Sequence, residues 1–130
     1  MAFNDPIADL LTKIRNALGA QHRFVDISLS KMVLNIIKIL KEQGYIQTYL
    51  ASEEKRKIRV FLKYNKKRKS VVRALNRISS PGLRKYVGWK QIQPVKNGFG
   101  ISILSTSIGI IDDKIARDKK VGGELLCCIW

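Results

Sequence analysis

Two short polar segments in the last third of the chain carry side chains that could take part in chemistry. Ser105-Thr106-Ser107 follows an apolar run, and Gly122-Gly123-Glu124 precedes the final apolar run. A hydroxyl acts as a nucleophile when a base such as His lies beside it. The chain contains a single His, His22, which is predicted to lie in a polar loop away from any other catalytic signal. We therefore expect the hydroxyls to bind a partner rather than to react, and we predict that the protein is not an enzyme.

The remaining candidates predict neither a metal site nor a cofactor. Zinc needs three or four ligands at characteristic spacing, and His22 with the adjacent Cys127 and Cys128 does not supply them. Gly98-Phe99-Gly100 lacks the third glycine of a dinucleotide-binding motif. Neighbouring residues of a strand point to opposite faces, so we expect one cysteine in the core. The two are a poor disulfide pair, and a reducing compartment is the simpler expectation.

The distribution of charge predicts a polyanionic partner. The formal net charge is +15, and the 57 residues 55–111 contain 15 Lys or Arg and no Asp or Glu. So long a segment of one sign favours nucleic acid as the partner, with an anionic membrane surface as the second candidate. No apolar run reaches the roughly 18 residues of a membrane-spanning helix, so none is predicted.

The first half of the chain predicts a small α+β layer. Asp5-Pro6 is typical of a helix start, and apolar residues at helical spacing continue this helix to Gly19. Ser30 is expected to cap a second helix, which Gly44 ends. Alternating apolar residues predict strands over 24–29, 45–51 and 58–64. The order is α-β-α-β-β, with both helices on one face of the sheet.

The second half is predicted to be mostly β with one short helix. A basic run at 65–69 is too polar for a core, so we place the domain boundary near it, giving domains 1–66 and 67–130. Residues 70–79 fit a helix face and a strand about equally well. Asp112 or Asp113 is expected to cap the helix. The expected strands are 84–87, 101–104, 108–111 and 125–130.

The candidate binding residues each have two interpretations. Arg84 and Tyr86 are expected to share a strand face, where they could contact phosphate and stack on a base; Tyr86 could equally be a half-buried strand residue. The hydroxyls of 105–107 suit the shallow minor groove of RNA, or they could satisfy the backbone of a turn. Glu124 needs a donor, such as a base amino group or a neighbouring Arg. Gly122 and Gly123 would permit close backbone approach.

Several motifs occur in order along nearly the whole chain, and the spacing from Ser-Thr-Ser to Gly-Gly-Glu is the most specific feature. They are Asp5-Pro6-Ile7-Ala8-Asp9, Ile14-Arg15-Asn16-Ala17, Pro81-Gly82-Leu83-Arg84 with Tyr86, Gly98-Phe99-Gly100-Ile101, Ser105-Thr106-Ser107 with Gly109, Ala116-Arg117, and Gly122-Gly123-Glu124 through Cys127 with Trp130. Together they resemble the family of small-ribosomal-subunit protein eight, in its bacterial or organellar form.

The resemblance implies an α+β protein of two subdomains that is a structural constituent of the small ribosomal subunit. It implies early, direct binding to a stem in the central domain of the small-subunit rRNA, assembly of the platform, and contact with neighbouring small-subunit proteins. The implied location is a cytoplasmic ribosome, or an organellar one. An alternative function is translational repression through a hairpin in the messenger RNA of its own operon.

The resemblance also implies which residues face RNA, and it favours strand for residues 70–79. The implied RNA-binding residues are Ser105, Thr106, Ser107, Gly123 and Glu124, with Arg84 and Tyr86 beside them and Lys31 at the start of the second helix as a contact to the RNA backbone.

Overall fold

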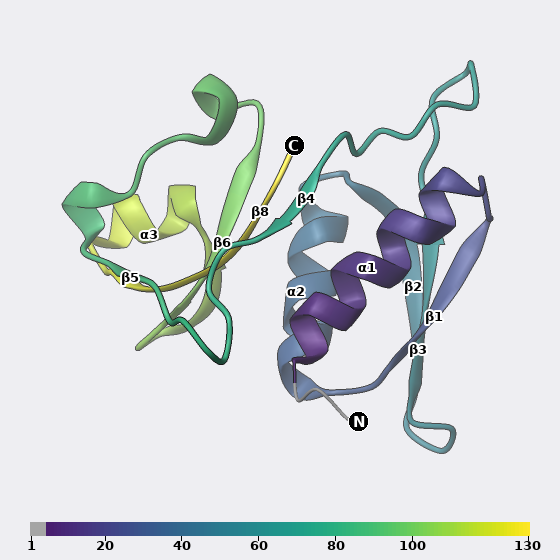
Figure 1. The fold of residues 1–130 in the computed structure, drawn as a ribbon, viewed down its shortest axis with the longest axis horizontal. Coiled ribbons are helices and arrows are strands. Elements are labelled where there is room, and N and C mark those ends of the chain that lie inside the picture. Colours follow the sequence, from purple (N-terminus) through teal and green to yellow (C-terminus); the bar gives the residue numbers. More distant parts are fainter. Residues whose placement is uncertain (1–4) are drawn as a thin grey trace. The chain divides into compact units, whose positions relative to one another are not determined.

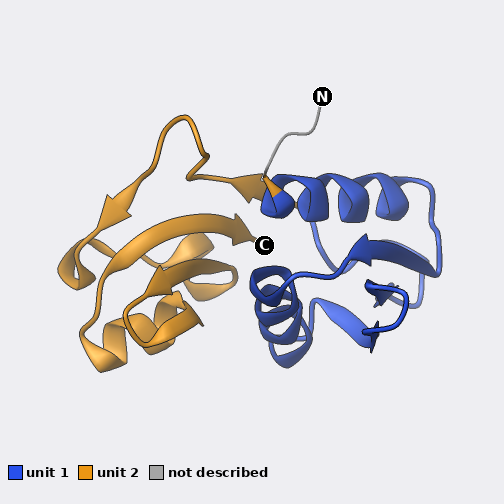
Figure 2. Cartoon of the chain, turned by 90° about the horizontal axis from the view of Figure 1, so that it is seen from below, with its two compact units in different colours: residues 1, 6–73 blue, residues 2–5, 74–130 orange. Residues whose placement is uncertain are grey.

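The structure is a computed structural model that describes residues 5–130. It divides into two compact units, drawn in different colours in Figure 2: residues 6–73 form unit 1, and residues 74–130 with residue 5 form unit 2. The boundary that the sequence predicts lies a few residues earlier, in the basic run. That 1–66 and 67–130 are separate domains stays a prediction.

Unit 1 is a three-stranded antiparallel sheet with two helices on one face (Figure 1). The strand order is β1-β3-β2. The predicted α-β-α-β-β order is confirmed, and the strand ends differ from the prediction by one or two residues. The elements are α1 (Pro6–Gly19), β1 (Phe24–Ser28), α2 (Lys31–Glu42), β2 (Ile46–Ser52) and β3 (Lys57–Leu62).

Local sequence accounts for the ends of α2, and apolar spacing accounts for its packing. The hydroxyl of Ser30 accepts a hydrogen bond from the backbone N–H of Val33 at 3.1 Å, as an N-cap does. Gly44 follows the helix with φ +80°, a conformation that glycine adopts without strain. The buried face of α2 carries Val33, Ile36, Ile37 and Leu40, and the inner face of the sheet carries the buried residues Ile27, Ile58 and Val60.

Unit 2 is a sheet of five strands, one α-helix and two turns of 3₁₀ helix. β8 pairs with β4, β5 and β6, and β6 pairs with β7. The predicted class, mostly β with one short helix, is confirmed. The elements are β4 (Leu75–Arg77), β5 (Tyr86–Val87), η1 (Trp89–Gln91), η2 (Val95–Gly98), β6 (Ile101–Thr106), β7 (Gly109–Asp112), α3 (Asp113–Lys119) and β8 (Gly123–Ile129).

Two adjacent acids connect α3 to the sheet. Asp112 is the N-cap, because its carboxylate accepts from the N–H of Ile115 at 2.9 Å. Asp113 is buried and accepts from the N–H of Ser102 on β6 at 3.2 Å and from Arg117 at 2.9 Å. The sequence allows either Asp112 or Asp113 as the N-cap of α3, and the structure shows that it is Asp112. Asp113 instead connects α3 to β6.

The structure corrects several strand limits in unit 2. Residues 70–79 form no helix, and their strand is confined to Leu75–Arg77, where β8 lies opposite. The expected strand 84–87 shrinks to Tyr86–Val87, so Arg84 precedes the strand and the expected alternation with Tyr86 does not apply. β6 and β8 instead reach further than expected and include most of the two polar segments. Among the described residues, no helix is long and apolar enough to cross a membrane.

Candidate functional site

The two polar segments lie opposite each other on paired strands. Ser105 of β6 faces Glu124 of β8, and Glu124 faces Tyr86 of β5. Directly opposed residues of an antiparallel pair share a face, with Cβ atoms about 5 Å apart. Tyr86, Glu124 and Ser105 therefore form one row across three strands, which we call the Glu124 row.

The Glu124 row lies on the face of the sheet that points away from α3. The neighbouring residues Val87, Leu104 and Leu125 pack with Ala116 of α3 in the core of unit 2. Successive side chains of a strand alternate between faces, so the row residues point to the opposite side. The core under α3 positions the row without covering it.

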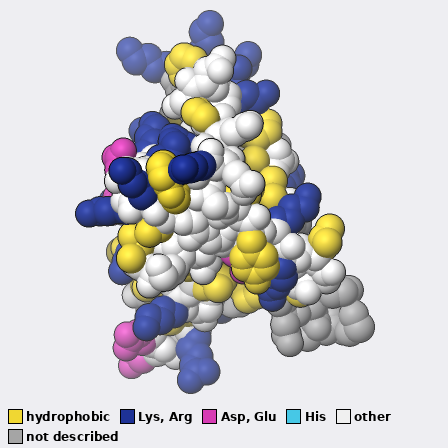
Figure 3. All heavy atoms as spheres, turned by 90° about the vertical axis from the view of Figure 1, so that its left-hand side faces the viewer, with side chains coloured by type: hydrophobic (Ala, Val, Ile, Leu, Met, Phe, Trp, Pro, Cys, Tyr) yellow, Lys and Arg dark blue, Asp and Glu magenta, His cyan; other side chains and the backbone are white. Residues whose placement is uncertain are grey.

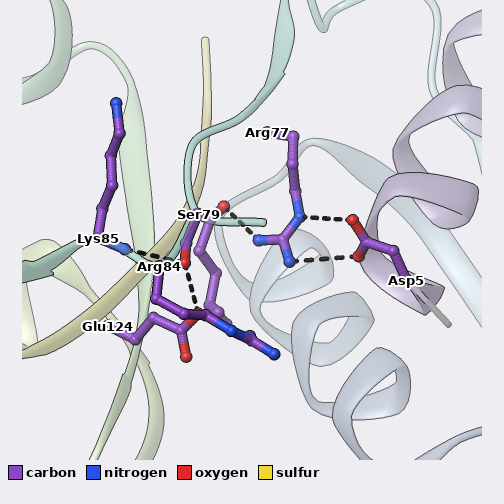
Figure 4. Close-up of polar contacts among 7 residues, drawn as sticks. Asp5, Arg77, Ser79, Arg84, Lys85 and Glu124 are labelled. Atoms are coloured by element: carbon purple, nitrogen blue, oxygen red, sulfur yellow. Dashed lines mark hydrogen bonds and ion pairs between the residues drawn. The ribbon is translucent and has the colours of Figure 1, made fainter. Parts of the chain in front are cut away.

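Glu124 is held by two donors from the segment between β4 and β5. Arg84 Nη1 donates to Glu124 Oε2 at 2.9 Å, and the Ser79 hydroxyl donates to the same oxygen at 2.5 Å (Figure 4). The backbone N–H of Lys85 donates to the Ser79 hydroxyl at 3.2 Å, which fixes the direction of that hydroxyl. The sequence suggests a base amino group or a neighbouring Arg as the donor to Glu124, and in the structure Arg84 is that donor.

The charges of this pair are stable near neutral pH. Burial raises the pKa of Glu124, but hydrogen bonds from Ser79 and Arg84 and the charges of Arg84 and Arg77 outweigh it. The pKa therefore lies below its ordinary value. The hydrogen bond that Arg84 donates to Glu124 in turn raises the pKa of Arg84. The Arg84 side chain is 48% exposed, so the rest of its guanidinium can contact a further anion.

The three hydroxyls have different surroundings. Thr106 Oγ1 donates to the carbonyl of Gly109 at 2.7 Å and accepts from the N–H of Ile108 at 3.3 Å, so it closes the turn between β6 and β7. For Thr106 the local interpretation is therefore correct. In the described part of the chain, the hydroxyls of Ser105 and Ser107 have no hydrogen-bond partner, and Ser107 is exposed. These two hydroxyls are available to a ligand.

The two glycines permit close approach, but to the protein's own backbone. A Cβ on Gly123 would overlap the carbonyl oxygen of Ser105, and one on Gly122 would overlap the carbonyl oxygen of Val87. Gly123 thus allows β8 and β6 to pair at the point where Ser105 enters the row.

Tyr86 is accessible, and Lys31 lies elsewhere. Tyr86 is 70% exposed, so it is not the half-buried strand residue that the sequence allows as an alternative. Lys31 is the exposed first residue of α2 in unit 1. The structure thus brings together, in unit 2, seven of the eight predicted site residues: Ser105, Thr106, Ser107, Gly123, Glu124, Arg84 and Tyr86.

Ser79 is a functional candidate that sequence reasoning missed. It is fully buried and contacts Glu124 from 45 positions away. The sequence offers one signal for Ser79, a hydroxyl shortly before the Pro81-Gly82 turn. Ser79 also lies in residues 70–79, whose secondary structure the residue pattern leaves open. Ser79 meets its partner Glu124 because β4 and β5 both pair with β8, which brings the segment between them beside Glu124.

The basic character of the chain, with a net charge of +15, favours binding of an anion. On the face drawn in Figure 3, Lys and Arg side chains occur at many places and Asp and Glu side chains at few. Within residues 5–130, no group of three or more His, Cys, Asp or Glu could hold a metal ion. The arrangement combines exposed hydroxyls, an accessible tyrosine and a fixed Arg–Glu pair in a strongly basic chain.

Comparisons with known proteins cover nearly the whole chain. The family model described as Ribosomal protein S8 matches residues 5–130. The chain is 51% identical over 129 residues to the small ribosomal subunit protein uS8 of Chlamydia felis, covering 98% of this chain and 97% of that protein. It is 48% identical to the uS8 protein of Protochlamydia amoebophila and 49% identical to that of Leuconostoc citreum, with all of both chains covered in each case.

Proposed function

The chain belongs to the ribosomal protein S8 family, whose members are structural, non-enzymatic components of the ribosome, and from that premise we propose that it binds rRNA through the Glu124 row. The proposed ligand is a stem in the central domain of the small-subunit rRNA. Binding there helps to assemble the platform of the subunit, beside neighbouring small-subunit proteins. The proposed location is the cytoplasmic ribosome.

One observation supports this proposal most: a fixed acid, whose side chain is 15% exposed, lies beside free hydroxyls on the sheet face that points away from α3. In the described structure both hydrogen bonds to the Glu124 carboxylate end on Oε2, which leaves Oε1 to accept from a base amino group. Ser105 and Ser107 can donate to or accept from 2′-hydroxyls and base edges in the minor groove of RNA. An acid in this position would repel phosphate, so it favours one particular arrangement of RNA over others.

The other residues would supply position and general attraction. The half-exposed guanidinium of Arg84 can contact a phosphate, and the exposed ring of Tyr86 can stack on a ribose or a base. The acid-free middle of the chain, residues 55–111, attracts RNA of any sequence. Specificity therefore rests on the row and its hydroxyls, and attraction rests on the basic residues.

A comparison of two variants tests this division. We expect Ser105→Ala with Ser107→Ala to lower affinity for the rRNA stem about tenfold or more, because each serine loses a direct hydrogen bond to RNA. Thr106 is left intact because its hydroxyl closes the turn. The comparison variant changes the basic residues of 66–69 to Gln; it should weaken the stem and an unrelated duplex alike and reduce the dependence of affinity on salt.

Footprinting of the wild-type protein on naked small-subunit rRNA completes the test. We expect protection of one irregular stem in the central domain. Equal losses of stem affinity in the two variants would contradict the proposed roles, and protection spread over the whole RNA would contradict the proposed ligand. Tighter binding to the leader of the protein's own messenger RNA than to the stem would instead favour the repressor function.

A further inference from the structure

The sheet of unit 1 carries an aromatic pair on the face that its helices leave open. Phe24 of β1 and Phe61 of β3 are directly opposed, and their ring centroids are 6.1 Å apart with the planes tilted by 56°. Their strand neighbours Val60 and Leu62 are buried on the helix side. Because side chains alternate along a strand, both rings lie on the other face. Figure 1 shows both helices of unit 1 on one side of this sheet.

A stacked arginine extends the aromatic pair. Arg59 is opposed to Asp26 and donates to its two carboxylate oxygens, Nε to Oδ1 at 2.9 Å and Nη2 to Oδ2 at 3.2 Å. The guanidinium carbon lies 4.1 Å from the centre of the Phe24 ring. Asp26 thus holds one edge of the guanidinium and Phe24 covers one face. The side chain remains 47% exposed, so its outer face is open to a further planar group.

A hollow of about 560 Å³ lies beside Phe61, in the range of small-ligand sites. Its lining includes Arg23, Gln47 and Tyr64. Gln47 is the extra residue of a bulge in β2, since Ile46 and Thr48 pair with adjacent residues of β3. A bulge redirects a side chain, and here it directs an amide to the hollow. The Tyr64 hydroxyl is occupied, donating to the carbonyl of His22 at 2.5 Å.

The charge of this surface selects among possible partners. Residues 6–73 contain sixteen Lys or Arg and five Asp or Glu, a net charge of +11. On the open sheet face the acid Asp26 is neutralised by Arg59, and Lys57 is exposed. Arg23, which lines the hollow, is also exposed. Stacking groups beside unpaired cations match unpaired nucleotides, which offer flat bases and phosphates together.

We propose that this aromatic face, made of Phe24, Phe61, Arg59 and Asp26, is a second RNA-binding surface that takes an unpaired RNA segment. One base stacks on the outer face of Arg59 or on the ring of Phe61. The next base enters the hollow, where Gln47 and Arg23 hydrogen-bond to its edge. This surface shares no residue with the Glu124 row of unit 2, so it stands even if the function proposed for the row fails.

The test measures binding of a single-stranded ten-nucleotide oligouridylate to the full-length protein. Saturating amounts of the rRNA stem are added in a parallel series, so that sites on unit 2 are occupied. We expect Phe24→Leu with Phe61→Leu to weaken oligouridylate binding at least roughly fivefold, because leucine keeps the apolar bulk and loses the stacking surface. Phe99→Leu is the matched control, since Phe99 is 88% exposed and lies in unit 2. It should leave the affinity unchanged.

A second variant keeps the test informative if the double variant is unstable. Arg59→Lys retains the charge but not the planar group, so it should weaken oligouridylate binding about threefold while binding of the stem is unaffected. Oligouridylate carrying 5-iodouridine should cross-link to Phe24, Phe61 or Tyr64 on irradiation. Unchanged affinity in the phenylalanine and Arg59 variants would overturn the proposal, as would cross-links confined to residues 74–130.

The aromatic face could alternatively bind a second copy of the chain. Sedimentation of the wild-type protein should show a monomer over the concentrations of the binding assay. A dimer that the phenylalanine variant abolishes, with RNA affinity unchanged, would assign the face to a second copy of the chain and overturn the proposal.

Discussion

Arg84 and Glu124 form an ion pair of 2.9 Å, although they are 40 positions apart in the sequence. Both are charged at neutral pH, and the buried hydroxyl of Ser79 holds the same carboxylate oxygen from a second direction. An isolated acid would repel the phosphates that a chain of net charge +15 otherwise attracts. The pair explains how the acid is retained: its charge is balanced within the protein before any ligand binds.

Glu124→Gln should change selectivity more than affinity. The amide keeps the size of the side chain but leaves Arg84 as an unbalanced cation. We expect binding to the rRNA stem to fall about three- to tenfold relative to binding to an unrelated duplex, because the pair is partly exposed and its energy is modest. Filter binding to both RNAs measures the ratio. Glu54→Gln, which removes an exposed acid from unit 1, is the control for net charge, and an equal ratio in the two variants would refute the role.

The stability of unit 2 should depend on the ionisation of Glu124. Its pKa is lower in the folded protein than in the unfolded chain, so its contribution is complete above the ordinary glutamate pKa of about 4.3 and is lost as the pH falls through the folded value. Glu124→Gln lacks this contribution. The difference in unfolding free energy between wild type and variant should therefore shrink below about pH 4. Urea unfolding at several pH values checks it; a difference that stays constant down to pH 3 would contradict the prediction.

Gly123→Ala should destabilise unit 2 and displace Ser105. The new Cβ would overlap the Ser105 carbonyl oxygen, so β6 and β8 must separate locally. We expect the free energy of unfolding to fall by about 1–3 kcal/mol. Both tryptophans, Trp89 and Trp130, lie in unit 2, so their fluorescence follows its unfolding. Gly82→Ala is the control, because nothing lies within 4 Å of a Cβ there; equal losses from the two changes would argue against the overlap.

The two cysteines should differ in reactivity, although they are adjacent. Cys127 is fully buried, which raises the pKa of its thiol to about 12. Cys128 is only half-buried, and burial also raises the pKa of its thiol. At pH 8 a thiol reagent should modify Cys128 first in the native protein and both residues at similar rates in urea. Peptide mapping of the labelled chain measures this. Equal native rates would contradict the placement of Cys127.

The elements of unit 1 were predictable because their signals are local. Ser30 and Gly44 mark the ends of α2 through their own conformations, and apolar spacing along the helix defines its buried face. In unit 2 the limits of short strands depend on what lies opposite. Residues 75–77 and 86–87 are strands because β8 pairs with them. Arg84 lies outside β5, because the pairing of β5 with β8 includes only Tyr86 and Val87.

The site shows the same division. The motifs of the resembled family implied that Ser105 and Glu124 both face RNA, and the structure places these two residues opposite each other on paired strands. They did not separate Thr106, which closes a turn, from the free hydroxyls of its neighbours. They also did not predict Ser79, because a buried hydroxyl has no pattern of its own until the acid that it contacts has been placed.

The sequence by itself determined the basic character of the chain, the order of its helices and strands, the lack of partners for a catalytic hydroxyl, and the resemblance to a ribosomal protein family. These follow from composition and from interactions between residues close together along the chain. The tertiary structure alone decided that Glu124 is held by Arg84 and Ser79, and that Arg59 stacks on Phe24. Strand pairing joins residues tens of positions apart, and a shift of one residue in register would turn the strand residues Glu124, Arg59 and Phe24 to the opposite face.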